Sequence, residues 1–502
     1  MPLPRDDART RRWPIALAVL MGTIAVVLNA TVINVAIPPI MADFGLSQAG
    51  AQWISTGFLA AMTAAMLASA RVIERLGQQR TFATALSVFL VACLIAAASP
   101  NAWVLIAARV VQGATAGIIQ PLALVVIFDS FDDAERGRAL GLYGMGVVLA
   151  PALGPTVGGV LIDWLSWRAV FLPSIPFCLL GLAGGWRVLP RQRSSEREPF
   201  DWLGFGLLGA ALVLLLSGLT ELSAYATLRG SLVTIAGAGF TIGFVVRLIT
   251  SPHPLIRLAV FAYPRFVLAS GIAVLYGAGL YASTYLVPLL AQSVQRLSPS
   301  ATGLVMMPAG LTLLAIFPIG GRLADRFAAH WLNIVGCGGF ALGTLGLALT
   351  GPGTPFWLLA ALVALGRMAL GIMMPALNIG GLRGLPSELT QQGSSVISFA
   401  RQLGGTLGVN LFALLLEIRA AHYLGGQVDL RSLYQGHAPS ARTLADITRA
   451  FHDTFAVFGA LFFVGVALAV GMALLHWREH RPGLVTPPPR DPVSDETGAN
   501  KR

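Results

Sequence analysis

The sequence Ala70-Arg-Val-Ile-Glu-Arg-Leu-Gly77 lies between two long apolar segments, and a similar one, Gly321-Arg-Leu-Ala-Asp-Arg-Phe327, lies between two others. In both, a small residue is followed four residues later by an acid and then directly by an arginine. A turn that returns at the same place in two series of apolar segments indicates two repeated halves. Such halves are typical of membrane proteins with a binding site at the midplane between them.

The composition places most of this chain in lipid. Its 502 residues are 55% hydrophobic and only 11% charged, whereas a soluble domain has about 25% charged residues. A helix needs about 20 apolar residues to cross a bilayer. The alternation of a membrane β-barrel is missing, so we expect an all-α membrane protein. Its fourteen expected transmembrane helices are 14–37, 51–70, 82–98, 103–127, 139–162, 168–189, 202–221, 230–249, 266–290, 302–320, 332–350, 356–379, 395–418 and 452–476.

The charges set the expected orientation. Most of the 34 basic residues fall in short segments and tails on one side of this plan, which indicates the cytoplasmic side and puts both termini there. The net charge of +11 thus orients the chain and requires no nucleic-acid partner. The membrane that we expect is a bacterial inner (plasma) membrane. Cys93, Cys178 and Cys337 are isolated within apolar segments, which favours simple packing over a disulfide or metal site.

Further motifs follow one another along the chain: Leu28–Pro38, Arg109–Gly113, the span-5 group from Gly141 to Gly159, Phe200–Gly204 and Arg401–Gly405. With the two turns, they resemble the fourteen-span drug:proton antiporter branch (EmrB/QacA type) of the major facilitator superfamily. The resemblance implies a major facilitator fold, two six-helix bundles with an inserted two-helix hairpin. The expected regions are a cytoplasmic tail at 1–13, the N-terminal bundle at 14–189, linker and hairpin at 190–249, the C-terminal bundle at 250–479 with an outer loop at 419–451, and a disordered cytoplasmic tail at 480–502.

The two turns are candidates for a cytoplasmic gate. An acid and an arginine at a helix end pair with neighbouring charges when a gate is shut and separate when it opens. The alternative is that these are ordinary loop charges. Ala70, Gln78 and Gln79 depart from the family pattern, which usually has glycine and a basic pair there. The resemblance implies the gating role for Glu74, Arg75, Gly77, Asp325 and Arg326, with Asp129 as a partner.

A polar face is expected on the fourth apolar segment. Arg109, Gln112 and Gln120 share one side of a helix, and a charge inside the membrane is costly unless it is paired or hydrated. The resemblance implies that Arg109 handles protons, whereas the alternative is a structural arginine that binds carbonyl groups. The motifs of the first and thirteenth segments add further candidates for substrate binding or coupling, namely Asn29, Asn34 and Arg401.

Two more groups are candidates for transport. Tyr281 and Tyr285 share one helix face and would line an adaptable apolar cavity, unless they face lipid or the core. Small residues on the fifth segment let helices approach closely. The resemblance implies that this motif forms a tight helix contact that biases the transport cycle towards export. In this sequence the motif comprises Gly141, Gly154, Pro155, Gly158 and Gly159.

Asn29 stands where the family usually has an aspartate, and asparagine cannot titrate. No acid lies at the centre of any expected helix, so two hypotheses remain open. In the first, protons are carried by an off-centre carboxylate, Glu417 or Glu221 outside and Asp129 or Glu74 inside. In the second, proton coupling is weak or absent, and Asn29 is a neutral hydrogen-bond partner for substrate or for Arg109.

The expected function is export of small amphipathic compounds, of the multidrug-efflux type, by alternating access across the lipid bilayer. The alternative is an exporter or facilitator of an endogenous metabolite with weak or no proton coupling. Neither needs a cofactor. No metal-ligand cluster, phosphate-binding glycine loop or Ser/His/Asp group is present in the sequence, so no enzyme activity is expected. A periplasmic adaptor, which some relatives use, would contact the outer loop, although no adaptor motif is evident.

Overall fold

The computed structural model describes residues 5–46, 48–190, 199–225, 228–297, 299–425 and 440–479, and these residues are almost entirely helical. Twelve helices in this part of the chain are long and apolar enough to cross a membrane. The helices are α1 (Arg5–Phe44), α2 (Gln48–Leu76), α3 (Gln78–Ala97), α4 (Ala102–Ser130), α5 (Asp133–Trp164), η1 (Trp167–Phe171), α6 (Ser174–Val188), α7 (Trp202–Tyr225), α8 (Leu228–Thr250), η2 (Leu258–Ala262), α9 (Pro264–Ser293), α10 (Pro299–Arg326), α11 (Ala329–Leu347), α12 (Phe356–Leu382), α13 (Ser387–Leu424) and α15 (Ala441–Glu479).

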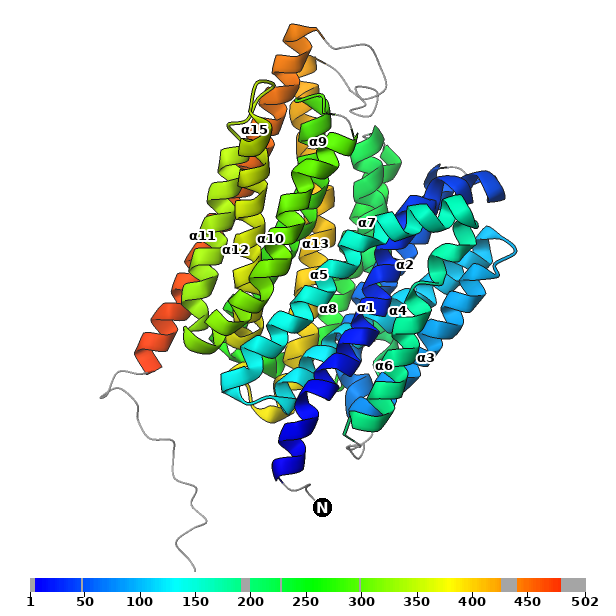
Figure 1. Ribbon diagram of the computed structural model, residues 1–502, viewed down its shortest axis with the longest axis vertical. Helices are drawn as coiled ribbons and strands as arrows, with labels where there is room; N and C mark the ends of the chain where they lie inside the picture. Colours follow the sequence, from blue (N-terminus) through cyan, green and yellow to red (C-terminus); the bar gives the residue numbers. More distant parts are fainter. Residues whose placement is uncertain are drawn as a thin grey trace, which may run out of the picture.

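The helices form two groups that stand side by side (Figure 1). In the first group, here the N half, α2 packs against α4, and α1 packs against α5 and α6. In the second group, the C half, α9 packs against α13, and α11 packs against α12 and α15. The two halves meet where α5 contacts α10 and α2 contacts α13. The repeated turn in the sequence thus corresponds to two helix groups in space.

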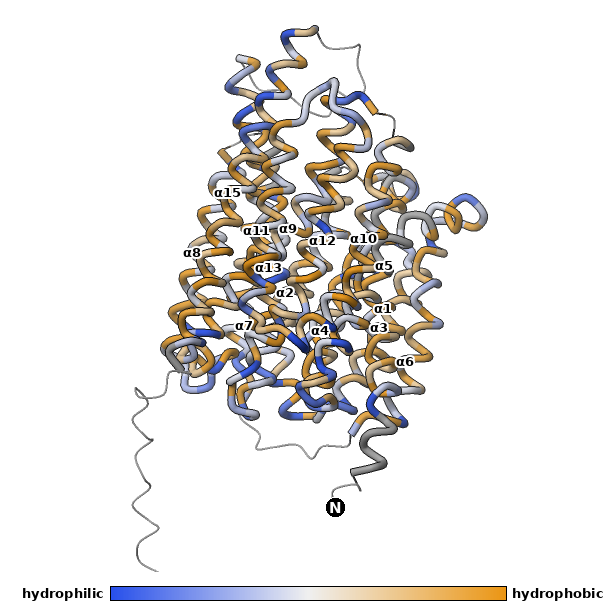
Figure 2. The backbone as a smooth tube through the Cα atoms, turned by 60° about the vertical axis from the view of Figure 1, so that its left-hand side comes forward, coloured by the Kyte–Doolittle hydropathy of each residue, from blue (hydrophilic) through white to orange (hydrophobic). Residues whose placement is uncertain are grey.

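The beginning of α1 and the end of α15 lie at one end of the bundle, here the terminal end (Figure 1). Figure 2 shows hydrophobic residues along the helices and hydrophilic residues gathered at the ends, as expected for a chain that crosses lipid. At the opposite, distal end, Asp43 of α1 accepts hydrogen bonds from Trp167 Nε1 and Arg168 Nη1, both at 3.0 Å. The bond from Trp167 and then that from Arg168 lower the pKa of the Asp43 carboxyl, because they favour its charged form.

Helices α7 and α8 pack tightly on each other, and α7 contacts α2 and α13. Asp201, just before α7, is buried, and its Oδ1 accepts the backbone N–H of Gly204 at 3.0 Å. Arg247, in the last turn of α8, places its Nη2 3.0 Å from the same oxygen. The Phe200–Gly204 stretch therefore caps one helix and ties it to the end of the next.

The observed helices extend the predicted ones at both ends of the chain. α1 begins at Arg5, so the predicted tail 1–13 is partly helical. An ion pair of 2.8 Å between Arg12 and Asp132 and an edge-on ring contact between Trp13 and Phe131 hold this extension against the start of α5. The predicted tail 480–502 lies outside the described residues.

The predicted outer loop at 419–451 is also shorter in the structure. α13 continues to Leu424 and α15 begins at Ala441, so both margins of that loop are helical. The hydroxyl of Tyr423 donates to Asp453 at 2.8 Å, which joins the two helices beyond the expected boundary. The expected count of fourteen membrane helices is not reproduced by length and composition, because α5 and α11 fall outside the twelve candidate spans among the described residues.

Replacing Asp201 tests the connection between α7 and α8. Asp201→Ala removes both the helix cap and the ion pair, and we expect it to lower the free energy of unfolding by about 2 kcal/mol. Asp201→Asn keeps the cap and loses only the charge, so its loss should be smaller. Thermal unfolding of the purified variants measures the order; equal melting temperatures for Asp201→Ala and the wild type would contradict it.

Candidate functional site

Arg109 lies inside the N half with 1% of its surface exposed. α4 positions it against α1 and α2. Its Nη1 donates to Asn29 Oδ1 at 2.5 Å and to Gln112 Oε1 at 2.8 Å. Its Nε donates to the carbonyl of Ile54 at 3.3 Å, and the guanidinium lies 4.1 Å from the centre of the Phe58 ring. The cation is therefore held on several sides by groups from three helices.

All these partners of Arg109 are neutral. Gln112 Nε2 lies 3.4 Å from Cys93 Sγ and Asn29 Nδ2 lies 3.7 Å from it, which closes the network on the side of α3. No carboxylate pairs with Arg109 within the described part of the chain. A buried charge is tolerated when polar groups replace its hydration, and this network does so. The structure thus brings Asn29 and Arg109 together; that the contact serves transport stays a prediction.

Two other residues of the predicted polar set do not join this network. Gln120 is buried on α4, but it lies eleven positions beyond Arg109, which is about 16 Å along a helix. The side chain of Asn34 lies outside the described residues, although its backbone belongs to α1.

Arg401 is a second buried cation, on α13. It is 8% exposed, and its Nη1 has no hydrogen-bond partner in the described part of the chain. α13 packs against α9 of its own half and contacts α2 and α4 of the N half. Arg401 therefore lies on a helix that contacts both halves, and its buried Nη1 has no partner among the described residues.

Tyr281 and Tyr285 are two exposed aromatic residues of α9, and an added Cβ on Gly405 of α13 would lie 2.3 Å from the Tyr281 ring. Each is 42% exposed, whereas Ala282 and Leu286 on the same helix are fully buried. This places the two tyrosines on the accessible side of α9, a position that suits a cavity lining and a lipid-facing surface alike. Their contact with a substrate stays a prediction.

Arg367 is a buried polar residue that the sequence did not lead us to select. It is 6% exposed on α12, and it donates to Thr284 Oγ1 at 2.7 Å and to the carbonyl of Leu280 at 3.2 Å. Both acceptors lie on α9, where Leu280 directly precedes Tyr281 and Thr284 directly precedes Tyr285. A comparison of the two repeated halves of the sequence would have revealed it. Arg367 precedes a glycine by four residues on α12, as Arg109 does on α4.

The two halves meet in a closed seam at the terminal end, where α5 and α2 contact α10 and α13. Asp325, at the end of α10, accepts the backbone N–H groups of Gly137 at 2.6 Å and Arg138 at 3.0 Å, both on α5. Here the backbones almost touch: a Cβ atom on Gly137 or on Gly321 would lie 2.2 Å from the carbonyl oxygen of the other. Only glycine fits at this crossing.

The first turn makes the equivalent contact on the other side of the seam. Glu74, at the end of α2, accepts from Gln392 Nε2 of α13 at 3.3 Å and from Arg71 Nη1 at 3.2 Å. Nearby, the hydroxyl groups of Ser69 and Ser395 are 2.7 Å apart. The acid of each turn therefore contacts the first turns of the fifth helix of the opposite half. Asp325 contacts α5, and Glu74 contacts α13.

The remaining gate candidates occupy more local positions. Gly77 has a φ of 77°, the left-handed region that favours glycine, and allows the turn between α2 and α3. Asp129 accepts from Gln78 Nε2 at 2.5 Å within the N half, so it does not cross the seam. Arg75 is half-buried in the last turn of α2, and Arg326 is exposed in the last turn of α10.

The residues of the span-5 motif divide between two neighbours of α5. Gly141 faces α10, where an added Cβ would lie 2.6 Å from the carbonyl oxygen of Phe317. Gly154 and Gly158 face α1, and Gly159 has open space beside it. The side chain of Pro155 lies outside the described residues. Through this motif, α5 thus packs against α10 of the C half and against α1 of its own half.

Two of the off-centre carboxylates expected for coupling, Glu221 and Glu417, lie outside the Arg109 network. Glu221 pairs loosely with Arg229 at 3.7 Å beside the α7–α8 connection. Glu417 is partly buried, thirty positions after the start of α13, or about 45 Å along it. The described residues contain no cluster of three His, Cys, Asp or Glu that would hold a metal ion.

The family model of the Major Facilitator Superfamily matches residues 19–409, which include the buried arginines and both turns. The chain belongs to this superfamily. It is 32% identical over 486 residues to the uncharacterized MFS-type transporter Rv1250 of Mycobacterium tuberculosis, covering 91% of this chain and 82% of that one. It is 28% identical to the Multidrug resistance protein B homolog of the same organism, covering 88% and 86%.

Among solved structures, the proton:xylose symporter XylE bound to 6-bromo-6-deoxy-D-glucose superposes with a TM-score of 0.61 at 14% identity, covering 94% of this chain and 96% of that chain. The fold is therefore that of a major facilitator protein, helical and multi-pass. The protein is a membrane transporter of small molecules and not an enzyme, in agreement with the sequence. These matches do not extend to its substrate or its energy source.

Removing the acceptor from Asn29 should leave the Arg109 charge poorly compensated. We expect Asn29→Leu to lower the free energy of unfolding by about 1–3 kcal/mol, the usual cost of an unsatisfied buried polar group. Asn29→Asp keeps an acceptor and should be more stable than Asn29→Leu. Thermal unfolding in detergent decides; a leucine variant as stable as the wild type would show that Asn29 does not hold Arg109.

Filling the glycine crossing should open the seam. In a Ser69→Cys/Ser395→Cys background, oxidation should cross-link the halves efficiently, because the two hydroxyl groups are 2.7 Å apart. Adding Gly137→Ala overpacks the crossing and should destabilise the closed seam by about 1–3 kcal/mol. The cross-linking rate should therefore fall roughly tenfold or more. Gly206→Ala, with open space at its Cβ, is the matched control. Unchanged cross-linking in the Gly137 variant would contradict the closed crossing.

Proposed function

We propose that this transporter exports small amphipathic compounds that are neutral or anionic, by alternating access between its two halves. The observation that carries the proposal is Arg401, whose buried Nη1 lacks a partner among the described residues, on the helix that packs against α9 with its exposed Tyr281 and Tyr285. A buried donor of this kind is satisfied when a ligand oxygen reaches it. A cationic substrate would instead meet two buried arginines, Arg109 and Arg401, without a carboxylate beside them among the described residues.

The proposed direction of transport, export, rests on the orientation of the chain in the membrane and on the packing of α5. The basic turns, the beginning of α1 and the end of α15 lie at the terminal end, which we assign to the cytoplasm of a bacterial inner membrane. The seam is closed there, so the present conformation is closed to the side that we assign to the cytoplasm. The tight packing of α5 at Gly141 and Gly154 supports the export reading of its motif. The multidrug resistance relative, at 28% identity, supports the class of substrate.

The topology we propose has fourteen spans. α5 and α11 pack within their halves like the other helices, and at 32 and 19 residues they are long enough to cross. Both carry polar residues near one end: Asp133 and Glu135 lie on α5, and His330 and Asn333 lie on α11. Helices α7 and α8 form the hairpin inserted between the N-terminal bundle and the C-terminal bundle. The proposed regions keep the predicted limits of 14–189, 190–249 and 250–479.

Proton coupling is the open part of the mechanism. The Arg109 network contains Asn29 where the antiporter motif has an acid, so no carboxylate of the described residues belongs to it. If coupling exists, it passes through an acid at the seam or the distal end, among them Glu74, Asp129, Glu221 and Glu417. The second candidate function, a facilitator of an endogenous metabolite without coupling, is favoured by this same contact.

Transport by purified protein in proteoliposomes tests the proposal. Anionic, neutral and cationic amphiphiles are compared under a pH gradient and under a membrane potential alone. We expect anionic and neutral compounds to be carried, and Arg401→Gln to slow the anionic ones about tenfold or more while sparing the neutral ones. Arg229→Gln, which removes a charge at the distal end of α8, is the control. Preferential transport of cations, unaffected by Arg401→Gln, would refute the proposed substrate class.

The same vesicles separate the coupled from the uncoupled mechanism. Transport driven by the pH gradient in the wild type would establish antiport despite Asn29. Transport indifferent to the gradient would establish facilitated movement. Asn29→Asp then shows whether an acid at this position creates a pH dependence that the wild type lacks, since only the aspartate can titrate.

A further inference from the structure

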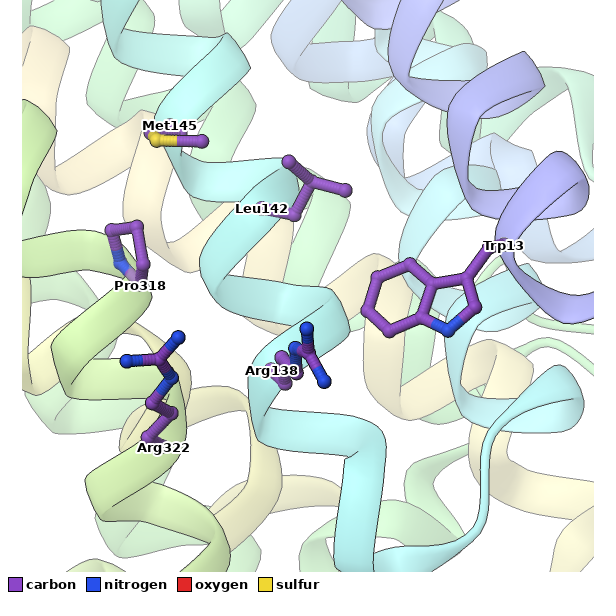
Figure 3. A pocket seen from close by; sticks show the side chains of 6 residues that line it. All are labelled: Trp13, Arg138, Leu142, Met145, Pro318 and Arg322. Atoms are coloured by element: carbon purple, nitrogen blue, oxygen red, sulfur yellow. The ribbon is translucent and has the colours of Figure 1, made fainter.

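A groove of about 420 Å³ lies beside the seam at the terminal end (Figure 3). Three helices line it: α1, α5 and α10. Figure 3 shows Arg322 on α10 at one side of α5 and the indole of Trp13 at the other, with the guanidinium of Arg138 between them on the side of Trp13. The residues of this seam groove are Trp13, Arg138, Leu142, Met145, Pro318 and Arg322.

The groove is cationic at one end and apolar along its length. Arg138 and Arg322 are exposed, and neither guanidinium forms an ion pair with a carboxylate of the described residues. Asp325, the nearest acid of the seam, is occupied by two backbone N–H groups. Leu142, Met145 and Pro318 continue the groove away from the arginines as an apolar, partly buried wall. A ligand with an anionic group attached to a hydrocarbon chain matches this groove, which is cationic at one end and apolar along the rest.

The position of the groove suits a ligand from the bilayer itself. Trp13 is the second residue of the candidate span Arg12–Ile33, and Arg322 lies in the last turns of the span Ala301–Arg326. Tryptophan and arginine at the ends of membrane spans lie at the level of the lipid headgroups. The Arg138 guanidinium is 5.2 Å from the centre of the Trp13 ring, which holds it at that level.

We propose that the seam groove binds an anionic phospholipid, with the phosphate between Arg138 and Arg322 and one acyl chain along Leu142, Met145 and Pro318. Guanidinium groups bind phosphate oxygens in a forked geometry, and anionic lipids are attracted to basic residues at the cytoplasmic surface. Arg138 belongs to the N half and Arg322 to the C half, so one headgroup bridges the seam. The lipid therefore stabilises the closed terminal end.

Lipid binding is measured without transport, so this site stands or falls separately from the proposed export. The purified full-length protein in detergent is titrated with dioleoyl phosphatidylglycerol, dioleoyl phosphatidylcholine and inorganic phosphate, followed by native mass spectrometry and thermal unfolding. We expect phosphatidylglycerol to bind and raise the melting temperature, and the other two to do neither. Arg138→Gln/Arg322→Gln should weaken phosphatidylglycerol binding about tenfold or more. Arg187→Gln, which removes an exposed charge from the last turn of α6, should not.

A second pair of variants covers the case in which the double glutamine variant does not fold. Arg138→Lys/Arg322→Lys keeps both charges but loses the forks, and it should bind the lipid more weakly than Arg187→Lys does. Binding that is unchanged in the groove variants overturns the site, and inorganic phosphate that reproduces the full effect overturns the lipid as its occupant. Cross-linking of Ser69→Cys/Ser395→Cys should be faster in phosphatidylglycerol vesicles than in phosphatidylcholine vesicles; equal rates would overturn the bridging of the seam.

Discussion

The carboxylate of Asp325 bound to the backbone N–H groups of Gly137 and Arg138 is the contact on which the arrangement of the halves depends. It joins the end of α10 to the early part of α5, and the glycine crossing beside it lets the two backbones approach. Glu74 reaches Gln392 of α13 in the equivalent way. Because each half supplies one acid and one receiving helix, the seam has the two-fold character that the repeated turn in the sequence indicates.

A different constraint governs the centre of the N half. Arg109 is a charge removed from water, and the helices around it supply neutral oxygens, a sulfur atom and an aromatic face rather than a counterion. This keeps the cation charged and fixed. An aspartate in place of Asn29 would pair with Arg109 and would itself exchange protons. With asparagine, the same geometry persists without that second function, which is why family membership alone does not establish proton coupling here.

The sequence predicted the class of fold, the repeat and the burial of Arg109, because these follow from long apolar segments and from the cost of charge in lipid. It did not predict that Gln78 binds Asp129, because a departure from a motif shows what is lost and not which new contact forms. It also missed Arg367, which was visible as an intramembrane arginine but gains its meaning from Thr284 on another helix. Helix ends at the surface, as in α13 and α15, were underestimated since helices continue beyond the lipid where side chains such as Tyr423 and Asp453 bind.

The contacts of the seam also determine how it can open. Hydrogen bonds from Asp325 and Glu74 and the crossing of Gly137 with Gly321 are all short-range, so a small separation of α5 from α10 weakens them together. Closely packed interfaces of this kind have discrete arrangements and do not deform continuously. The terminal end should therefore behave as a two-state gate. A groove that presents Arg138 and Arg322 from opposite halves lies where a bound anion would bias that equilibrium most directly, because its two partners move apart as soon as the seam does.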